Sequence, residues 1–405
     1  MDKNPITGLI LIAAVLFGYT WYNQPSQEEM EAQRVQDSIA TVAKQNAEEQ
    51  KKIAETARAA TVMQAAQDST SLFHNAMQGQ AQDVILQNEK IALTLSSKGA
   101  TVSKAVIKGF EDNEGNGDVT LFDMATQRLN FTLVAKEQNI STEDLYFTPS
   151  DVTPNSVTFT AEAGEGRSVV ITYALGKDYM LSCSIRANGM AGLFQPNTSR
   201  MDINWQEQCK QQEKGFTFEN RYSTLTYHFV EGGTDYLNET SEKIDETVDE
   251  AIDWVAFKNQ FFSAVMIAKD GFGTDALLTS IPQEKGSGFL KHYEAKLKTA
   301  FDPKGINASE LEFYFVPNDF RLLQSVEEES TFGKDLQLQQ LVYLGWPLFR
   351  YINRWFTLYV FDFLRSLAIP MGIILILITL LLKAITYPMV KKSYMSSAKM
   401  RVLKP

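Results

Sequence analysis

The pattern of apolar and polar residues places an uninterrupted apolar run near each end of the chain, at 6–22 and 367–382. A helix needs about 20 apolar residues, and at least about 17, to cross the hydrocarbon core of a bilayer. The first run has that length, and the second has it once residues 384–387 are included. We therefore expect a membrane protein with two transmembrane helices, at 1–22 and 367–388.

A cleaved signal peptide is the alternative for the first run, because the run is N-terminal and Lys3 precedes it. Signal peptidase requires small residues after the apolar stretch, whereas this stretch ends in bulky residues that include Trp21 and Tyr22. Those two aromatic side chains suit the interface between a membrane and water. An uncleaved anchor is therefore the prediction.

The segment that follows the first run is rich in Ala, Glu, Gln and Lys, and has neither Gly nor Pro from Ser26 to Gln78. This composition favours a helix, but its apolar residues are too sparse for a coiled-coil seam. We expect a helical or partly disordered periplasmic tether over 23–80. A helix that docks to a specific partner is the alternative.

From about residue 88 the apolar residues recur with a period of two, which is typical of half-buried antiparallel strands. Glycine-containing turns, such as 164–166 and 232–233, separate the alternating stretches. A domain of this kind, over 81–335, is expected to be an all-β sandwich or an extended form of one. The alternating sets include Ile91/Leu93/Leu95, Val157/Phe159, Val169/Ile171/Tyr173 and Tyr179/Leu181/Cys183/Ile185.

Apolar residues return to helical spacing between residues 346 and 365. One side of this helix is aromatic, and Arg350 and Arg354 lie on the other side. Such a helix next to a transmembrane run is expected to lie in the outer membrane interface, within 336–366. Packing against the β-domain is the alternative. The residues assigned to the interface are Trp346, Phe349, Trp355 and Phe356.

The distribution of charged residues predicts the orientation of the chain in the membrane. The tail at 389–405 contains Lys391, Lys392, Lys399 and Arg401 and no acidic residue, so the positive-inside rule places it in the cytoplasm. Two spans then place the N-terminus there too. The whole chain carries −11, residues 1–22 carry zero and 367–405 carry +6, which leaves −17 for the exported segment. Such acidity argues against DNA or RNA as a partner.

Candidate catalytic chemistry is sparse. The three histidines are far apart and have no partners at metal-ligand spacing, so neither a metal site nor a cofactor is expected. The acidic stretch at 242–250 is interpreted as a solvated loop, not a catalytic carboxylate pair. Spacing does not decide whether Cys183 and Cys209 pair, although two buried free thiols are favoured slightly. The chain is not expected to be an enzyme.

Lys383 is the one charged residue of the second span. Its long side chain can extend to the cytoplasmic interface, which is the simpler interpretation. Alternatively, it faces a water-filled cavity within the membrane and attracts polar or acidic segments in transit.

The last 23 residues carry a recognisable motif. A basic residue is followed by Tyr387-Pro388 and then by a tail with Tyr394, Ser396, Lys399-Met400, Leu403 and Pro405. This segment resembles the second transmembrane segment and cytoplasmic exit of the YidC membrane-protein insertases, of the YidC/Oxa/Alb family, in a Bacteroidetes-like form. Residues 87–110 and 254–267 are also similar to strands of that family's periplasmic domain.

The resemblance implies a β-supersandwich like that of galactose mutarotases and a hydrophilic intramembrane groove in which Lys383 is the charge and Thr379 a polar neighbour. It implies nascent integral membrane proteins as clients, the Sec translocon and ribosome–nascent chain complexes as partners, and the bacterial inner membrane as location. Family members commonly have arginine at the position of Lys383, and continue into a helical hairpin and further spans. The chain is therefore expected to be an N-terminal portion. A membrane-anchored periplasmic carbohydrate-binding or scaffold protein is the alternative.

Overall fold

The computed structural model describes residues 72–403 except 113, 116, 238–241 and 346, together with residues 52, 56, 57 and 60. The predicted first span at 1–22 and most of the predicted tether at 23–80 lie outside the described residues. The four separate residues within the tether are helical.

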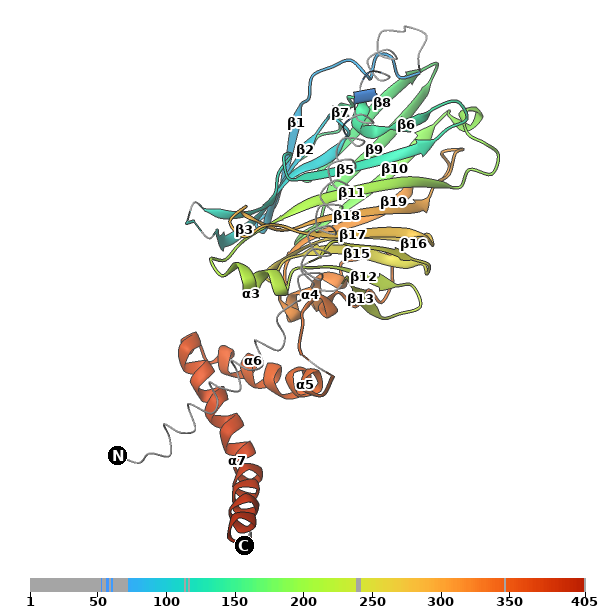
Figure 1. Ribbon diagram of the computed structural model, residues 1–405. Coiled ribbons are helices and arrows are strands. Elements are labelled where there is room, and N and C mark those ends of the chain that lie inside the picture. The colour runs from blue at the N-terminus through green and yellow to red at the C-terminus, as the bar shows by residue number, and fades with distance from the viewer. Residues whose placement is uncertain are drawn as a thin grey trace, which may run out of the picture.

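The described part of the chain contains nineteen strands (Figure 1). They are β1 (Asp83–Gln87), β2 (Ile91–Ser96), β3 (Thr101–Glu111), β4 (Asp118–Phe122), β5 (Gln127–Val134), β6 (Asn139–Ser141), β7 (Thr148–Ser150), β8 (Ser156–Gly164), β9 (Arg167–Leu175), β10 (Met180–Asn188), β11 (Arg200–Lys210), β12 (Thr224–Phe229), β13 (Thr234–Tyr236), β14 (Ile244–Val248), β15 (Ile252–Lys258), β16 (Phe262–Phe272), β17 (Ala276–Pro282), β18 (Phe289–Ala300) and β19 (Ser309–Pro317).

The helices are few and, until the end of the chain, short. They are η1 (Thr142–Asp144), η2 (Ala191–Leu193), α3 (Phe216–Arg221), α4 (Phe320–Glu327), η3 (Leu338–Leu341), α5 (Pro347–Ile352), the π-helical segment η4 (Asn353–Thr357), α6 (Leu358–Ser366) and α7 (Met371–Leu403). The domain that precedes α5 is therefore all-β in character, as the alternating sequence predicts.

The strands form two antiparallel sheets. One has four strands in the order β1-β2-β3-β4. The other has fifteen, with the path β6-β5-β11-β18-β16-β19-β10-β9-β8-β7 and with β12 to β15 and β17 attached beside it. The strands at both ends of that path, β6 and β7, have three residues each, and so has β13, which pairs only with β12.

The predicted alternation of more buried and less buried residues is confirmed, for example in β2. Ile91, Leu93 and Leu95 are all fully buried on β2, and their neighbours Ala92 and Thr94 are half-buried. The turn predicted at 164–166 joins β8 to β9 and has a positive φ at all three residues, including Glu165 at 55°.

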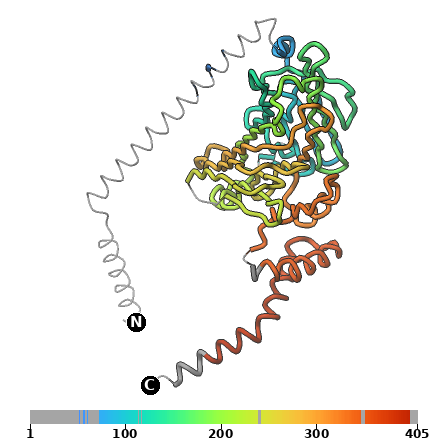
Figure 2. The backbone as a smooth tube through the Cα atoms, turned by 90° about the vertical axis from the view of Figure 1, so that its right-hand side faces the viewer, coloured from blue at the N-terminus to red at the C-terminus, as the bar shows by residue number. Residues whose placement is uncertain are grey.

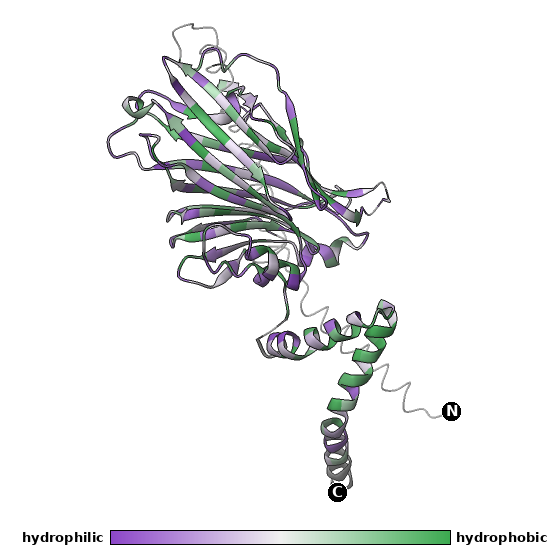
Figure 3. Cartoon of the chain, turned by 180° about the vertical axis from the view of Figure 1, so that it is seen from behind, coloured by the Kyte–Doolittle hydropathy of each residue, from purple (hydrophilic) through white to green (hydrophobic). Residues whose placement is uncertain are grey.

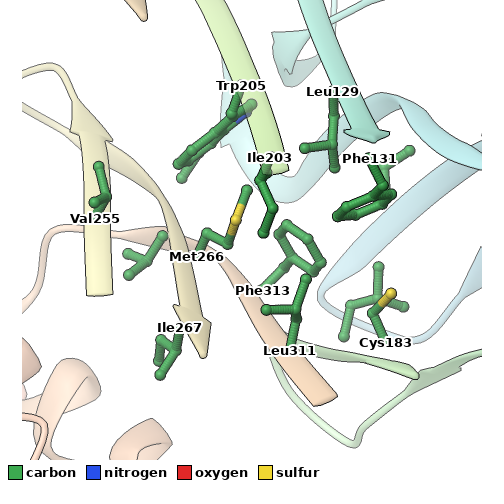
Figure 4. Packing of buried hydrophobic residues seen from close by; sticks show 14 of the residues in the cluster. Leu129, Phe131, Cys183, Ile203, Trp205, Val255, Met266, Ile267, Leu311 and Phe313 are labelled. Carbon is green, nitrogen blue, oxygen red and sulfur yellow. The ribbon is translucent and has the colours of Figure 1, made fainter. Parts of the chain in front are cut away.

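One hydrophobic core joins the two sheets. Phe122 of β4 meets Phe315 of β19 edge to face, with 5.3 Å between the ring centroids. Phe110 of β3 meets Phe262 of β16 in the same way at 5.4 Å. In Figure 4, side chains from β5, β10, β11, β15, β16 and β19 converge on this core.

The large sheet is strongly curved. Between β11 and β15 the hydrogen-bonded path crosses β18 and β16, so a flat sheet would separate them by three strand spacings, or about 14 Å. Trp205 of β11 nevertheless stacks on Phe257 of β15 with ring centroids only 3.8 Å apart. The sheet therefore curves back on itself, so that β11 and β15 face each other across the core, as the two layers of a sandwich do.

The packed domain extends beyond the predicted limits, before residue 81 and after residue 335. Phe73 and Ala76 are buried before β1, and Leu336, Leu338 and Leu341 are buried after β19. The division of the chain at those limits stays a prediction, whereas the buried residues show where the core itself begins and ends.

Residues 318–345, which we call the strap, cross from β19 to the C-terminal helices. One carboxylate, on β19, holds it to the domain, and a second, within the strap, holds two parts of the strap together. Glu312, fully buried on β19, accepts hydrogen bonds from Ser330 and from the backbone and side chain of Thr331, each at 2.8 Å. Glu327 accepts from three successive backbone N–H groups at 336–338. The indole of Trp254 donates to the carbonyl of Leu336 at 2.7 Å.

Below the domain, as Figure 1 is oriented, α5, η4 and α6 continue into one another and lie across the direction of α7. We call α5, η4 and α6 together the interfacial helix. Figure 2 shows the same arrangement from the side, with α7 leading away from the β-domain. The helix predicted from the periodicity at 346–365 is thus present, with a π-helical turn in its middle.

Candidate membrane-facing site

The aromatic side of the interfacial helix is exposed. Trp355, Tyr359 and Phe363 follow one another at intervals of four residues and are 64%, 54% and 63% exposed. Phe356 is half-buried. Trp346 lies outside the described residues, and of Phe349 the structure describes only the backbone, which is part of α5. The surface of a soluble protein seldom presents such a row of large apolar side chains, because it is unfavourable to expose each of them to water.

Polar contacts, in contrast, join the interfacial helix to the β-domain. Arg321 of α4 donates from Nε to the carboxylate of Asp362 on α6 at 3.0 Å, and its guanidinium lies 5.1 Å from the ring of Tyr359. The side-chain amide of Asn353 donates to the carbonyl of Leu344 at 3.0 Å. The helix is therefore held to the strap by its polar groups and by the contact of Arg321 with Tyr359, whereas Trp355 and Phe363 remain exposed.

The following helix, α7, contains a stretch that can cross a membrane. Residues Met371–Ser396 are long and apolar enough to do so, by length and composition. At a rise of 1.5 Å per residue, these 26 residues extend about 39 Å, more than the roughly 30 Å of a hydrocarbon core. Figure 3 shows hydrophobic residues concentrated in the first part of α7.

Thr379 and Lys383 lie four residues apart on α7, so their side chains share one side of the helix. Both are exposed, and the hydroxyl of Thr379 donates to the carbonyl of Leu375 at 2.7 Å. The structure thus brings together the two residues that the sequence assigned to a groove. It describes no other span that could form a second wall.

The helix continues through Pro388, which was expected near its end, as far as Leu403. Proline has no N–H to donate to the carbonyl four residues earlier, so the helix lacks one hydrogen bond here. Lys391 and Lys392 are exposed just beyond it. Lys399 and Arg401 are helical, and their side chains lie outside the described set.

A pocket of about 220 Å³ lies where the strap, β12 and the interfacial helix meet. Lys258, Arg350 and Arg354 are among its lining residues. Sequence reasoning assigned the two arginines only to the polar side of the helix. Their spacing of four residues was the available signal, but the sequence did not reveal that the β-domain would close a pocket over them.

A second pocket, of about 350 Å³, opens beside β5 and β11 and has a polar lining that includes Arg128, Glu143, Gln206 and His292. Lys98 also lines it, and burial lowers the pKa of its ammonium group. Polar side chains of this kind line many small-molecule sites, but their arrangement here does not point to a reaction.

The two cysteine thiols are unreactive in the folded domain. Cys183 and Cys209 are free and buried, as the sequence favoured. Burial raises the pKa of Cys183 to about 12 and that of Cys209 well above its ordinary value, so neither forms a thiolate at neutral pH. Among residues 72–403, so far as they are described, no three His, Cys, Asp or Glu side chains gather in a group that could hold a metal ion.

Comparison with known proteins gives a family match. Residues 83–359 match the family described as "YidC periplasmic domain". A protein of Phocaeicola vulgatus named "Membrane protein insertase YidC" is 46% identical over 408 residues, which cover all of this chain and 65% of the relative. One of Bacteroides fragilis with the same name is 40% identical, with the same coverage. The chain therefore spans about two thirds of the length of these relatives.

Likeness to solved structures is weak. A galactose mutarotase-like protein from Lactobacillus casei has a TM-score of 0.37 and 14% identity, over 58% of this chain and all of that one. An active YidC insertase structure with its first transmembrane domain resolved has a TM-score of 0.34 and 12% identity, over 82% of this chain and 60% of that one.

Proposed function

Because this chain belongs to the YidC family of membrane protein insertases, we propose that it supplies the periplasmic domain, the interfacial helix and one groove-lining span of an insertase in the bacterial inner membrane. The β-domain lies in the periplasm, and the N-terminus and the basic tail at 389–405 lie in the cytoplasm. The charges of the tail and the acidity of the exported segment support this orientation.

One observation carries the proposal: Lys383 and Thr379 lie exposed on the same side of α7, within its apolar first part. A lysine at the centre of a membrane helix costs about 2.5–3.5 kcal/mol on insertion scales, so such residues face water or protein instead of lipid. A hydrated groove beside α7 would remove that cost. It would also accept hydrophilic parts of a client chain.

The groove acts by reducing a desolvation cost. A polar segment that enters hydrocarbon loses its hydrogen bonds to water, at a cost of several kcal/mol for each unsatisfied group. In the groove, Lys383 attracts acidic groups and Thr379 offers a hydroxyl, so a client segment keeps part of its solvation while the neighbouring apolar segment moves into lipid. The mechanism uses only binding energy and requires no cofactor.

The interfacial helix sets the depth of the span. Trp355, Tyr359 and Phe363 reach the acyl region of the outer leaflet, just below the headgroups, together with the half-buried Phe356. Phe349 belongs to the same side by its spacing from Phe356, and the sequence prediction adds Trp346 to the residues of the interface. Burial of this aromatic side keeps the groove at a fixed position relative to the bilayer.

The partners are nascent integral membrane proteins, received from ribosomes or from the Sec translocon. Lys391, Lys392, Lys399 and Arg401 form a basic surface at the cytoplasmic end of α7, suited to anionic lipid headgroups or to ribosomal RNA. The acidic β-domain is an unsuitable surface for nucleic acid, so contact with the ribosome belongs to the tail.

The test is insertion of a single-span client with an acidic translocated segment, by the full-length protein in proteoliposomes. We expect K383A to reduce the yield severalfold and K383R to retain most of it, because arginine keeps the charge. K285A, which removes an exposed lysine in the turn between β17 and β18, serves as the matched control and should insert the client nearly as well as wild type. Equal insertion by K383A and K285A would refute the role of Lys383 in the groove.

A further inference from the structure

We propose that the pocket between the β-domain and the interfacial helix binds the headgroup of an anionic phospholipid of the phosphatidylglycerol type. Its volume of about 220 Å³ is far above the roughly 10–15 Å³ that one water molecule needs, so it can hold more than a single small ion. Anion binding follows from the pocket itself, whereas the choice of a lipid rests on the proposed position of the interfacial helix in the membrane.

Among the described residues that line the pocket, every charged side chain is positive. Lys258, Arg350 and Arg354 contribute three cations. Lys258 donates to the carbonyl of Tyr222 at 3.0 Å, which holds its ammonium group at the wall. Arg350 and Arg354 are exposed and have no ion-pair partner within the described part of the chain.

These two arginines suit a phosphate group. They lie four residues apart, on successive turns of the interfacial helix, so their guanidinium groups leave the helix on the same side. A guanidinium group donates two parallel hydrogen bonds to a phosphate and remains charged at every physiological pH. A phosphodiester in the pocket would therefore receive charge-assisted hydrogen bonds from one or both residues.

The charge of the lining also bears on the kind of headgroup. An ammonium group, as in phosphatidylethanolamine, is disfavoured beside the three cations. The hydroxyls of a glycerol headgroup can donate hydrogen bonds without adding positive charge.

The location of the pocket also suits a lipid. It opens on the polar side of the interfacial helix, while Trp355 and its neighbours occupy the opposite, aromatic side. If the aromatic side lies in the acyl region, the polar side lies at the level of the lipid phosphates. Phe320, Leu341 and Tyr343 add apolar wall, against which the glycerol carbons can pack.

The experiment measures binding of dihexanoyl phosphatidylglycerol, a soluble short-chain lipid, to the detergent-solubilised full-length protein by calorimetry. We expect R350Q/R354Q to weaken binding about tenfold or more, because each lost charge-assisted hydrogen bond accounts for about one factor of ten. R365Q removes an exposed arginine of α6 outside the pocket lining and should bind like wild type. R350Q/R354Q should also reduce the preference for phosphatidylglycerol over dihexanoyl phosphatidylethanolamine, because it removes two of the three cations that disfavour the ammonium group.

Three outcomes would overturn the proposal. Unchanged binding in R350Q/R354Q would exclude this pocket as the site. Binding of inorganic phosphate as tight as that of the lipid would exclude a lipid as the ligand. Arginine-dependent binding of polyglutamate, with no such binding of phosphatidylglycerol, would assign the pocket to an acidic polypeptide.

The position of the helix is tested separately, by quenching of Trp355 fluorescence with brominated lipids in nanodiscs, with W355F to identify its signal. Quenching of Trp355 without arginine-dependent lipid binding would refute only the pocket assignment. Absence of quenching would refute the membrane position of the helix, and with it the choice of a lipid.

Discussion

Glu207 is a buried carboxyl group with little to stabilise its charge. It lies on β11, is 1% exposed, and its Oε2 has no hydrogen-bond partner within the described structure. Burial raises its pKa from an ordinary 4.5 to about 8, although the nearby charge of Lys210 opposes that shift. At neutral pH the group is therefore largely protonated in the folded domain.

This raised pKa predicts a loss of stability as pH increases. Below about 4.5 the group is protonated in both states and the effect is absent. Between about 4.5 and 8 the unfolded chain ionises and the folded one does not, so the free energy of unfolding falls by up to about 1.4 kcal/mol per pH unit. E207Q removes this dependence.

The measurement is urea unfolding of wild type and E207Q at several pH values, followed by the fluorescence of the buried Trp205 and Trp254. As the pH rises to about 8, E207Q should become more stable relative to wild type. Above that pH the difference between their free energies of unfolding should stay constant. A constant difference across this range would show that Glu207 has an ordinary pKa.

The strap depends on single side chains in a way that strands do not. Glu327 accepts hydrogen bonds from the N–H groups of Leu336, Gln337 and Leu338, and Leu336 and Leu338 are themselves fully buried. One carboxylate thus fixes the path of the chain immediately before the interfacial helix.

E327A should therefore loosen the strap locally. Hydrogen bonds to a charged group contribute about 1.5–3 kcal/mol each, so amide hydrogen exchange at residues 336–338 should accelerate about tenfold or more. E328A alters the exposed neighbouring residue and should leave that exchange unchanged. If the two variants exchange alike at 336–338, the strap is held by its leucines and not by Glu327.

The elements differ in how far the sequence could predict them. Strands β2, β9 and β10 follow from alternating burial, because a period of two is visible within a few residues. The strap has no periodicity, since its order comes from isolated contacts such as that of Glu312 with Thr331. The π-helical turn at Asn353–Thr357 also lacks a sequence signal.

In the candidate site, too, the sequence predicted pairs of residues on one helix and did not predict contacts between distant residues. Thr379 and Lys383 could be paired from their spacing on one helix, and Arg350 with Arg354 likewise. The contact between Arg321 and Asp362 joins residues 41 positions apart, so no local pattern predicts it. The sequence therefore located the groups on each helix, and tertiary packing decided which of them meet the β-domain.

At the scale of the whole molecule, the reactivity of the two cysteines reports whether the β-domain is folded. Cys183 on β10 and Cys209 on β11 are buried in one core, and burial suppresses their thiolates. We expect neither to react with a maleimide at neutral pH until the domain unfolds, and then both to react with the same urea midpoint as the tryptophan fluorescence. Labelling of one cysteine well before that midpoint would show that the two regions open independently.

The short strands at the margins of both sheets have a consequence for the proposed work of an insertase. An exposed strand edge is a template on which any extended chain can pair, and long edges invite such capture. Strands β6, β7 and β13 each offer only three residues, and β1, β4 and β14, which also pair on one side only, offer five. In the proposed function, client segments emerge beside this domain, and edges this short give them few residues on which to pair.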